Sequence, residues 1–404
     1  MKMMKNMRIS AAALLVSIVL SGCDDWMEPE SKQIFAGTTE NTKSEEYYAN
    51  LRAYKESEHA IAFGWFAWSG APGAELLNSF TGMPDSLDLV SLWAGPGGGM
   101  TPEMTADLRR VQELKGTKIV ICTFIQDVGQ GCTPPEHSKD QVGVAGQKEY
   151  WGWVDGDDEA IRASLQRYAK GLADRVIEGG WDGLDIDYEP TVDAYASTLD
   201  DYVRNGERIY VRWLLEELST YLGPQSGSGK LLIVDGQINQ LPKSVAPYLD
   251  YFIRQTYTQP SPPYSMSTVG TEASKNSDLA STINYLKDEA NGIDDEYITN
   301  RYITTENLEY GPIGGRGGWY WRFIEDSKNT SNNSADGGNA IAAPINEYPS
   351  LRGHALWQPS NGFRKGGFGG YHFESGRPGT PSYKWMRLAI QDQNPAQTVT
   401  ESND

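Results

Sequence analysis

The feature of this 404-residue sequence that most constrains its fold is the alternation of short apolar runs with segments of helical periodicity. An unbroken apolar run is typical of a strand buried on both faces of a parallel sheet. We predict strands at residues 60–65, 87–93, 119–125, 184–189, 231–234, 251–257, 302–306 and 367–373. Helical patterns lie between most of them, at residues 101–116, 161–176, 211–222, around 245, 283–286 and 383–390. Eight strands joined by crossover helices predict a single closed (β/α)8 TIM barrel.

The fourth predicted strand carries three acids at alternate positions, Asp185, Asp187 and Glu189. Side chains of a strand point alternately to its two faces, so these carboxyl groups share one face. Like charges are costly to bury together, and their crowding raises the pKa of at least one member. Glu189 is the last residue before Pro190, where a central strand cannot continue. Active sites of barrels lie at such strand ends, so Glu189 is the candidate catalytic acid.

A metal site is the alternative interpretation of these acids, because oxygen ligands suit Mg²⁺ or Ca²⁺. Three acids on one straight strand diverge, however, instead of wrapping around an ion. The chain has four His, which argues against a zinc site. We therefore expect neither a metal nor another cofactor.

The run Asp-Gly-Leu-Asp-Ile-Asp-Tyr-Glu at residues 182–189 resembles the D-x-x-D-x-D-x-E signature of glycoside hydrolase family 18. That family contains chitinases and endo-β-N-acetylglucosaminidases, and its signature ends the fourth strand of a (β/α)8 barrel. The resemblance implies that Glu189 is the acid and that Asp187 holds the acetamido group of the substrate. It implies that Asp185, beneath Asp187, shares a proton or hydrogen bond with it. It also implies that the N-acetyl oxygen of the substrate is the nucleophile.

The sixth predicted strand extends the resemblance, because Gln255 and Tyr257 share one of its faces. They are similar to the Gln-x-Tyr pair of the family's endo-glycosidases. This implies that Tyr257 steadies the developing oxazolinium and that Gln255 binds substrate, although a tyrosine at a strand end more often only packs. Family chitinases often have Trp on the eighth strand as the pocket floor, where this chain has Tyr371 and Phe373. Further candidate sugar-binding residues lie at or just past strand ends: Trp65, Gln126, Asn239, Glu306, Trp357 and Tyr371.

The N-terminal residues have the pattern of a targeting segment. Basic residues precede an apolar run at 9–20 that is too short to span a bilayer as a helix. The following Leu-Ser-Gly-Cys23 resembles a bacterial lipobox, which implies a signal peptide at 1–22 and a lipid anchor at Cys23. Asp24 and Asp25 resemble the surface-export signal of Bacteroidetes lipoproteins, so we expect an outer-membrane lipoprotein exposed at the cell surface. We expect a polar tether at 23–57, the barrel at 58–395 and a polar tail at 396–404.

Composition argues against nucleic acid as a partner and leaves open whether two cysteines form a disulfide. A net charge of −19 and a pI near 4.7 argue against nucleic acid, which requires basic patches. Cys122 and Cys132 could pair outside the cytoplasm, but Cys122 lies in an apolar strand where a buried free thiol fits equally well.

The expected function is that of a retaining endo-glycosidase that cuts the β-1,4 bond next to N-acetylglucosamine in the chitobiose core of N-glycans. Gln255, the expected surface location and a plan without an attached chitin-binding module favour a glycan or glycoprotein substrate over chitin. The alternatives are a chitinase-like hydrolase and a non-catalytic glycan-binding barrel.

Overall fold

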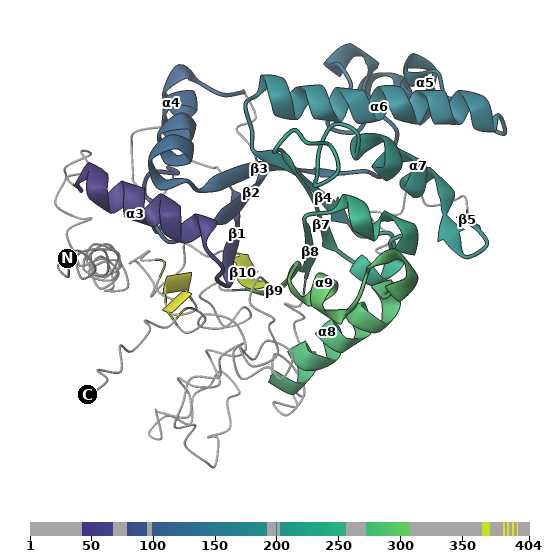
Figure 1. Cartoon of the computed structure of the whole chain (residues 1–404). Helices are drawn as coiled ribbons and strands as arrows, with labels where there is room; N and C mark the ends of the chain where they lie inside the picture. The colour runs from purple at the N-terminus through teal and green to yellow at the C-terminus, as the bar shows by residue number, and fades with distance from the viewer. Residues whose placement is uncertain are drawn as a thin grey trace, which may run out of the picture.

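The computed structural model describes residues 43–67, 79–94, 99–191, 199, 203–255, 272–307, 366–371, 383, 386, 387, 390, 391 and 394. Its main β-sheet contains β1 (Ile61–Ala67), β2 (Leu89–Ala94), β3 (Lys118–Phe124), β4 (Gly183–Tyr188), β7 (Leu231–Gly236), β8 (Tyr251–Arg254), β9 (Tyr302–Asn307) and β10 (Gly367–Tyr371). In this part of the chain, these parallel strands close into a barrel in the order β1-β10-β9-β8-β7-β4-β3-β2 (Figure 1). The predicted (β/α)8 barrel is confirmed, with the acidic strand fourth along the chain.

Helices surround the barrel (Figure 1): α3 (Glu45–Glu56), α4 (Pro102–Arg110), α5 (Lys139–Trp151), α6 (Asp158–Glu178), α7 (Ile209–Leu218), α8 (Glu272–Leu286) and α9 (Asp295–Thr299). Short helical segments lie in the connections, a π-turn at Val111–Lys115 and 3₁₀ segments at Pro135–His137, Ile238–Gln240, Lys243–Tyr248 and Glu289–Asn291. A small antiparallel hairpin pairs β5 (Val203–Arg204) with β6 (Glu207–Arg208). No described helix is both long enough and apolar enough to cross a lipid bilayer.

Local sequence signals explain where α4 begins and where its continuation ends. The Thr101 hydroxyl accepts a hydrogen bond from the backbone N–H of Met104, and Pro102 occupies the first helical position. The π-turn after α4 ends at Gly116, whose φ of 69° lies in the left-handed region that glycine adopts without strain. Both ends agree with the prediction for residues 101–116.

Helix α3 corrects the expected extent of the polar tether. Residues 45–56 are helical and bury Tyr48 and Leu51, and Arg52 donates a hydrogen bond to the carbonyl oxygen of Leu114. The folded region therefore includes α3 and does not begin at residue 58. Two buried apolar positions among many charged ones give too weak a period to reveal this helix in the sequence.

The sequence also did not predict α5, α9 or the β5–β6 hairpin. Gly143 has a non-helical φ of 73° inside α5, so this helix is interrupted and its apolar period is lost. Helix α9 covers a single short stretch, Asp295–Thr299, which is too brief for a periodic pattern.

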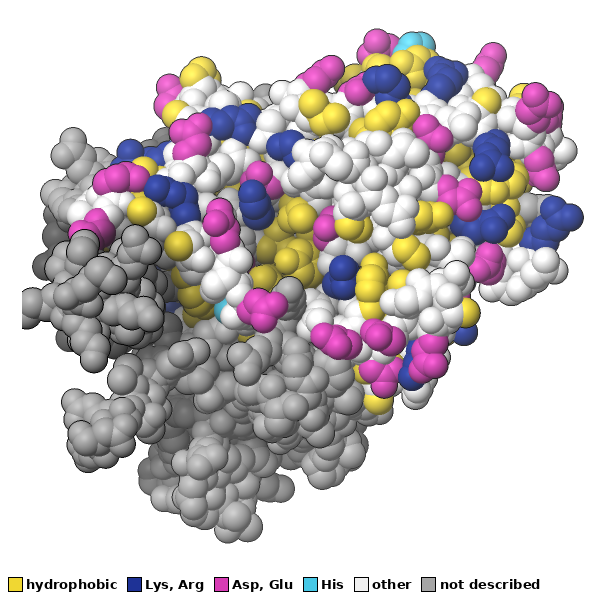
Figure 2. All heavy atoms as spheres, viewed as in Figure 1, with side chains coloured by type: hydrophobic (Ala, Val, Ile, Leu, Met, Phe, Trp, Pro, Cys, Tyr) yellow, Lys and Arg dark blue, Asp and Glu magenta, His cyan; other side chains and the backbone are white. Residues whose placement is uncertain are grey.

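Apolar side chains fill the barrel below its acids. Phe63, Val120, Ile233 and Ile303 lie in the early part of their strands and are fully buried inside the barrel. A larger apolar cluster packs the outer faces of the strands against the helices, and Leu184 and Ile186 of β4 belong to it. On the face seen in Figure 2, acidic and basic side chains are intermixed around a central apolar area. The apolar side chains inside the barrel make its interior an environment in which ionised groups are costly.

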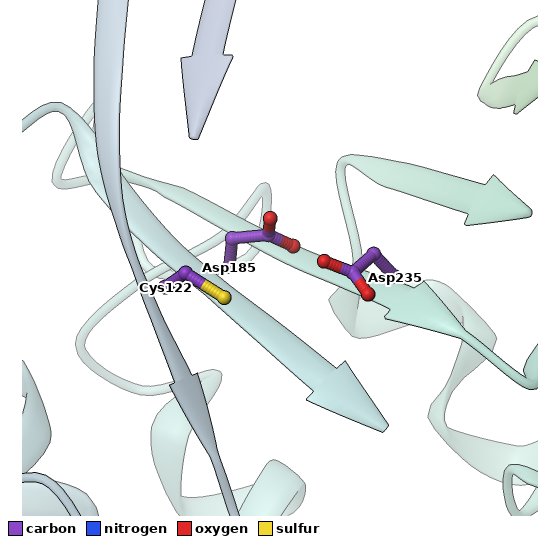
Figure 3. Close-up of side chains that lie close together, drawn as sticks. All are labelled: Cys122, Asp185 and Asp235. Atoms are coloured by element: carbon purple, nitrogen blue, oxygen red, sulfur yellow. The ribbon is translucent and has the colours of Figure 1, made fainter. Parts of the chain in front are cut away.

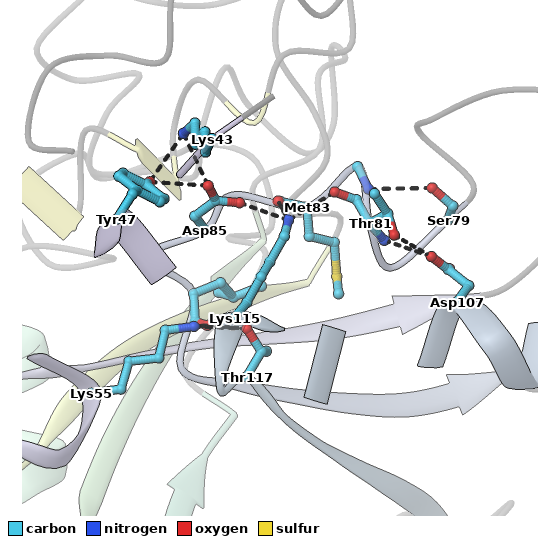
Figure 4. A network of polar contacts seen from close by, with 12 residues as sticks. Lys43, Tyr47, Lys55, Ser79, Thr81, Met83, Asp85, Asp107, Lys115 and Thr117 are labelled. Carbon is cyan, nitrogen blue, oxygen red and sulfur yellow. Dashed lines mark hydrogen bonds and ion pairs between the residues drawn. The ribbon is translucent and has the colours of Figure 1, made fainter. Parts of the chain in front are cut away.

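A buried ion pair holds the segment that leads into β2 (Figure 4). Lys115 Nζ lies 2.7 Å from Asp85 Oδ1 and also donates to the carbonyl oxygens of Thr81 and Met83. Lys43 and the Tyr47 hydroxyl reach the other carboxylate oxygen of Asp85 at 3.0 Å. Burial opposes ionisation, yet these cations hold the pKa of Asp85 well below its usual range. The network ties α3 and the π-turn to the entry of β2.

Candidate active site

The acids of β4 face the inside of the barrel at its C-terminal end. Leu184, Ile186 and Tyr188 pack on the outer face, and the acids alternate with them. Asp185 is 0% exposed, whereas Asp187 and Glu189, nearer the mouth, are partly exposed. The carboxyl groups of Asp185, Asp187 and Glu189 therefore lie at increasing distances from the apolar interior of the barrel.

A further acid, Asp235, joins this group from β7. It is 0% exposed and is the register partner of Asp187 on β4. Figure 3 shows its carboxyl group facing that of Asp185, with the Cys122 thiol close by. The sequence analysis missed Asp235, although an acid directly after the apolar run at 231–234 marks a strand end. Its closeness to Asp185 depends on the pairing of β4 with β7, which the sequence does not specify.

Two residues predicted to bind substrate contact these acids. The indole Nε1 of Trp65 donates to Asp235 Oδ2 at 2.9 Å. The amide Nε2 of Gln255 donates to Asp235 Oδ1 at 2.9 Å and to Asp187 Oδ1 at 3.2 Å. Gln255 therefore links the acids of β4 and β7.

Burial raises the pKa values of these acids because an apolar interior disfavours the charged form. It raises the pKa of Asp185 to about 6, and burial together with the charge of Glu189 raises the pKa of Asp187 to about 7. Burial also raises the pKa of Glu189. Burial, followed by the charges of Asp185 and Asp187, raises the pKa of Asp235 well above its ordinary value. The cluster thus retains protons near neutral pH, as general acid catalysis requires.

The other predicted site residues have different surroundings. Gln126, after β3, accepts a hydrogen bond from Gln130, and Asn239 donates to Ser281 of α8 at 2.9 Å instead of to an acid. Glu306 lies in β9 and Tyr371 ends β10, but their side chains are outside the described structure. Tyr257, Trp357 and Cys23 lie outside the described residues.

Cys122, Asp185 and Asp235 form a cluster with the composition of a possible metal site. Their ligand atoms lie within 4.8 Å of one another. Burial, followed by the charge of Asp185, raises the pKa of the Cys122 thiol well above its ordinary value, and a metal requires the thiolate. Cys122 and Cys132 are free thiols, so of the two alternatives the unpaired state is the one observed.

Acids with raised pKa values lie at the C-terminal mouth of the (β/α)8 barrel, which makes them candidates for general acid catalysis. The sequence matches the family model described as glycoside hydrolase family 18, BT1044-like, over residues 27–330. The protein therefore belongs to glycoside hydrolase family 18 and is a hydrolase of that family, which confirms the resemblance seen at residues 182–189.

Individual relatives agree with this family. Endo-beta-N-acetylglucosaminidase F2 of Elizabethkingia meningoseptica is 25% identical over 344 residues, covering 83% of this chain and 79% of the relative. A solved structure of a glutamate-to-glutamine variant of BT1044 has a TM-score of 0.60 at 27% identity, covering 87% of this chain and 93% of that one. An endo-beta-N-acetylglucosaminidase from Cordyceps militaris shares the fold, with a TM-score of 0.52 and 21% identity over 88% of this chain and 98% of that one.

Proposed function

We propose that this protein is a retaining endo-β-N-acetylglucosaminidase that hydrolyses the β-1,4 bond in the chitobiose core of N-glycans. The observation that carries the proposal is the group formed by Asp187, Glu189 and Gln255 at the mouth of the barrel. Membership of glycoside hydrolase family 18 supports glycosidic bond cleavage. The relative named endo-beta-N-acetylglucosaminidase F2 supports the endo-acting subtype.

Glu189 acts as the general acid in the proposed reaction. Burial raises its pKa above the ordinary value, which favours the protonated form that donates a proton to the leaving oxygen as the glycosidic bond breaks. After the leaving group departs, the carboxylate accepts a proton from the water that attacks the sugar. The same residue thus acts as acid and then as base.

Asp187 positions the nucleophile, which belongs to the substrate. The N-acetyl oxygen attacks the anomeric carbon and forms an oxazolinium ion, and water then opens this ring with overall retention. Asp187 holds the acetamido N–H and orients the oxygen, while Gln255 fixes Asp187 through its hydrogen bond of 3.2 Å. We propose that Tyr257, which lies outside the described residues, also steadies this intermediate.

We further propose that the protein is an outer-membrane lipoprotein, anchored through Cys23 and exposed at the cell surface. The lipobox-like residues before Cys23 and the acidic pair after it support this location. A surface enzyme meets glycoproteins directly, which favours N-glycans as substrates.

An intermediate analogue tests the proposed chemistry. A thiazoline mimic of the oxazolinium should inhibit hydrolysis, because analogues of high-energy states bind about 10²-fold or more tighter than substrates. Substrates with a 2-hydroxyl group in place of the 2-acetamido group should not be cleaved at a useful rate. Detection by mass spectrometry of a sugar bound covalently to any carboxylate of the protein would contradict this mechanism.

A further inference from the structure

A cavity of about 530 Å³ opens between the β5–β6 hairpin, α7, α8 and the 3₁₀ segment Lys243–Tyr248. The hairpin lies beside α7, outside the ring of barrel strands (Figure 1). Volumes of about 300–1,000 Å³ are typical of sites for small molecules. No acid of the candidate active site is among the described residues that line the cavity, so the cavity is a separate feature of the surface.

The lining of this cavity is positively charged, although the protein as a whole is acidic. Arg204, Arg212 and Lys243 line it, and among the described lining residues Glu207 alone carries a negative charge. The whole chain has a net charge of −19. A concave surface lined mainly by cations attracts anions and concentrates the field of its charges.

The cations of the cavity have hydrogen-bonding capacity that the protein does not use. Two atoms of the Arg212 guanidinium lie 3.8 Å from carboxylate oxygens of Glu207 and Glu216, which is beyond hydrogen-bond distance. Arg212 Nε is buried and has no hydrogen-bond partner in the described part of the chain. Nor do the side chains of Arg204 and Lys243 hydrogen-bond to any residue that the structure describes. A guanidinium in this state can bind a carboxylate through two parallel hydrogen bonds.

Hydrogen bonds between elements hold the walls of the cavity in place. Arg208 Nη1 donates to the carbonyl oxygen of Gln240 at 3.0 Å, which ties the hairpin to the loop after β7. The Tyr285 hydroxyl donates to the carbonyl oxygen of Leu241 at 2.7 Å, which ties α8 to the same loop. The cavity is therefore preformed, and a ligand need not order these segments when it binds.

We propose that this cavity is an accessory site that binds the carboxylate group of an acidic sugar of the sialic acid class. The cations supply the charge partners of the carboxylate, and the side-chain amide of Asn205 supplies a partner for sugar hydroxyl groups. Lys243 Nζ lies 4.9 Å from the centroid of the Tyr285 ring, so a cation and an aromatic ring form one wall. Sugars present both polar groups and C–H faces, which matches such a wall.

The size of the cavity argues against larger anionic partners. A nucleic acid or an anionic membrane requires basic side chains spread along an extended surface. Here the cations surround one concavity. The choice of a sugar as the carrier of the carboxylate rests on the proposed function, because N-glycans can end in acidic sugars. Binding at this site raises the local concentration of such glycans at the enzyme.

Calorimetric titration with sialyllactose tests the site without any hydrolysis. This trisaccharide carries one carboxylate and contains no N-acetylglucosamine, and lactose is the matched probe without the carboxylate. Sialyllactose should bind at low ionic strength with a millimolar dissociation constant, and lactose should not bind detectably. Absence of sialyllactose binding, or equal binding of lactose, would overturn the proposal.

Substitution of the exposed cations locates the binding site. Arg204→Ala combined with Lys243→Ala should weaken sialyllactose binding about fivefold or more, because two charge partners are lost. Arg110→Ala combined with Lys118→Ala is the matched control, since both residues are exposed cations outside the cavity. The control should bind within about twofold of wild type. Equal losses in the two variants would show that net charge alone attracts the sugar and would overturn the proposal.

Nuclear magnetic resonance provides a measurement that does not depend on how the alanine variants fold. In wild-type protein labelled with ¹⁵N-arginine, sialyllactose should shift the Nε–H signal of Arg212, assigned by its loss in Arg212→Lys. An unchanged signal at saturating sialyllactose would refute the site.

Inorganic sulfate distinguishes a sugar site from a general anion site. Sulfate should compete with sialyllactose but bind more weakly, because it lacks the sugar contacts. Sulfate binding as tight as that of sialyllactose would overturn the assignment to a sugar. Failure of the wild type to cleave N-glycopeptides would contradict the proposed function, whereas these titrations would still decide whether the cavity binds an acidic sugar.

Discussion

At the scale of single residues, burial raises the pKa values of the carboxyl groups at the mouth of the barrel, and neighbouring charges raise those of Asp187 and Asp235 further. Asp185 and Asp235 are fully buried, whereas Asp187 and Glu189 are nearer the mouth. The alternation of acids was sufficient to predict that Asp185 and Asp187 of β4 share a face, with Glu189 directly after the strand. It could not reveal Asp235, because the contact with Asp185 depends on which strand pairs with β4. Spacing along the sequence predicts which residues share a face of one strand. Contacts between residues of different strands depend on which strands pair and in which register.

A first prediction concerns the pH dependence of stability. The pKa of Asp187 is raised to about 7 by burial and by Glu189, so between about pH 4 and 7 the folded state binds more protons than the unfolded state. The free energy of unfolding should therefore fall as pH rises through this window, by at most about 1.4 kcal/mol per pH unit for one proton.

Asp187→Asn removes this titration. We expect the variant to be more stable than the wild type at pH 8 and the difference to shrink as pH falls toward 5, measured by denaturant unfolding. A difference that grows as the pH falls would mean that Asp187 is stabilised in its ionised form.

At the scale of elements, the site depends on the ends of β4 and β7 lying close together. Gly236, the residue after Asp235, has a φ of 102°, and a Cβ added there would lie 2.5 Å from the carbonyl oxygen of Tyr188. A glycine is required both for this conformation and for this approach. The strands themselves were predictable because burial on both faces leaves continuous apolar runs, whereas a close contact between two backbones leaves no such pattern.

We predict that Gly236→Ala destabilises the protein by about 1–3 kcal/mol and lowers kcat, because β4 and β7 must separate beside the acids. Gly229→Ala is the control, since Gly229 also has a positive φ, 71°, but no atom would lie within 4 Å of its added Cβ. Thermal unfolding and kinetics of both variants check this. Equal losses in the two would show that backbone conformation, and not the contact with Tyr188, is responsible.

At the scale of the whole molecule, the alternation of strands and helices predicted the closed barrel, but not how far the fold extends before it. Helix α3 packs through Tyr48, Leu51 and the Arg52 hydrogen bond, and the Asp85 network fixes its start. Such contacts join segments far apart in the sequence and leave no periodic pattern. Asn239 donates a hydrogen bond to Ser281 of α8, and Gln126 accepts one from Gln130 of its own loop, so a role of either residue in sugar binding stays a prediction.

Anchoring is also a property of the whole molecule. If Cys23 carries the lipid, Cys23→Ala should abolish labelling by a fatty-acid probe and release a soluble protein with unchanged specific activity, because the acids lie in the barrel. Cell fractionation with immunoblotting measures this. Continued membrane association of the unlabelled variant would refute the proposed lipid anchor.

The most direct test of the proposed function is incubation of the purified protein with a defined N-glycopeptide, followed by mass spectrometry. The wild type should leave one N-acetylglucosamine on the peptide and release the remaining glycan. Glu189→Gln should bind the glycopeptide but cleave it at least about 10²-fold more slowly, because an amide cannot donate the required proton. A wild type that binds the glycopeptide without cleaving it, or a Glu189→Gln variant within about tenfold of wild-type activity, would contradict the assignment.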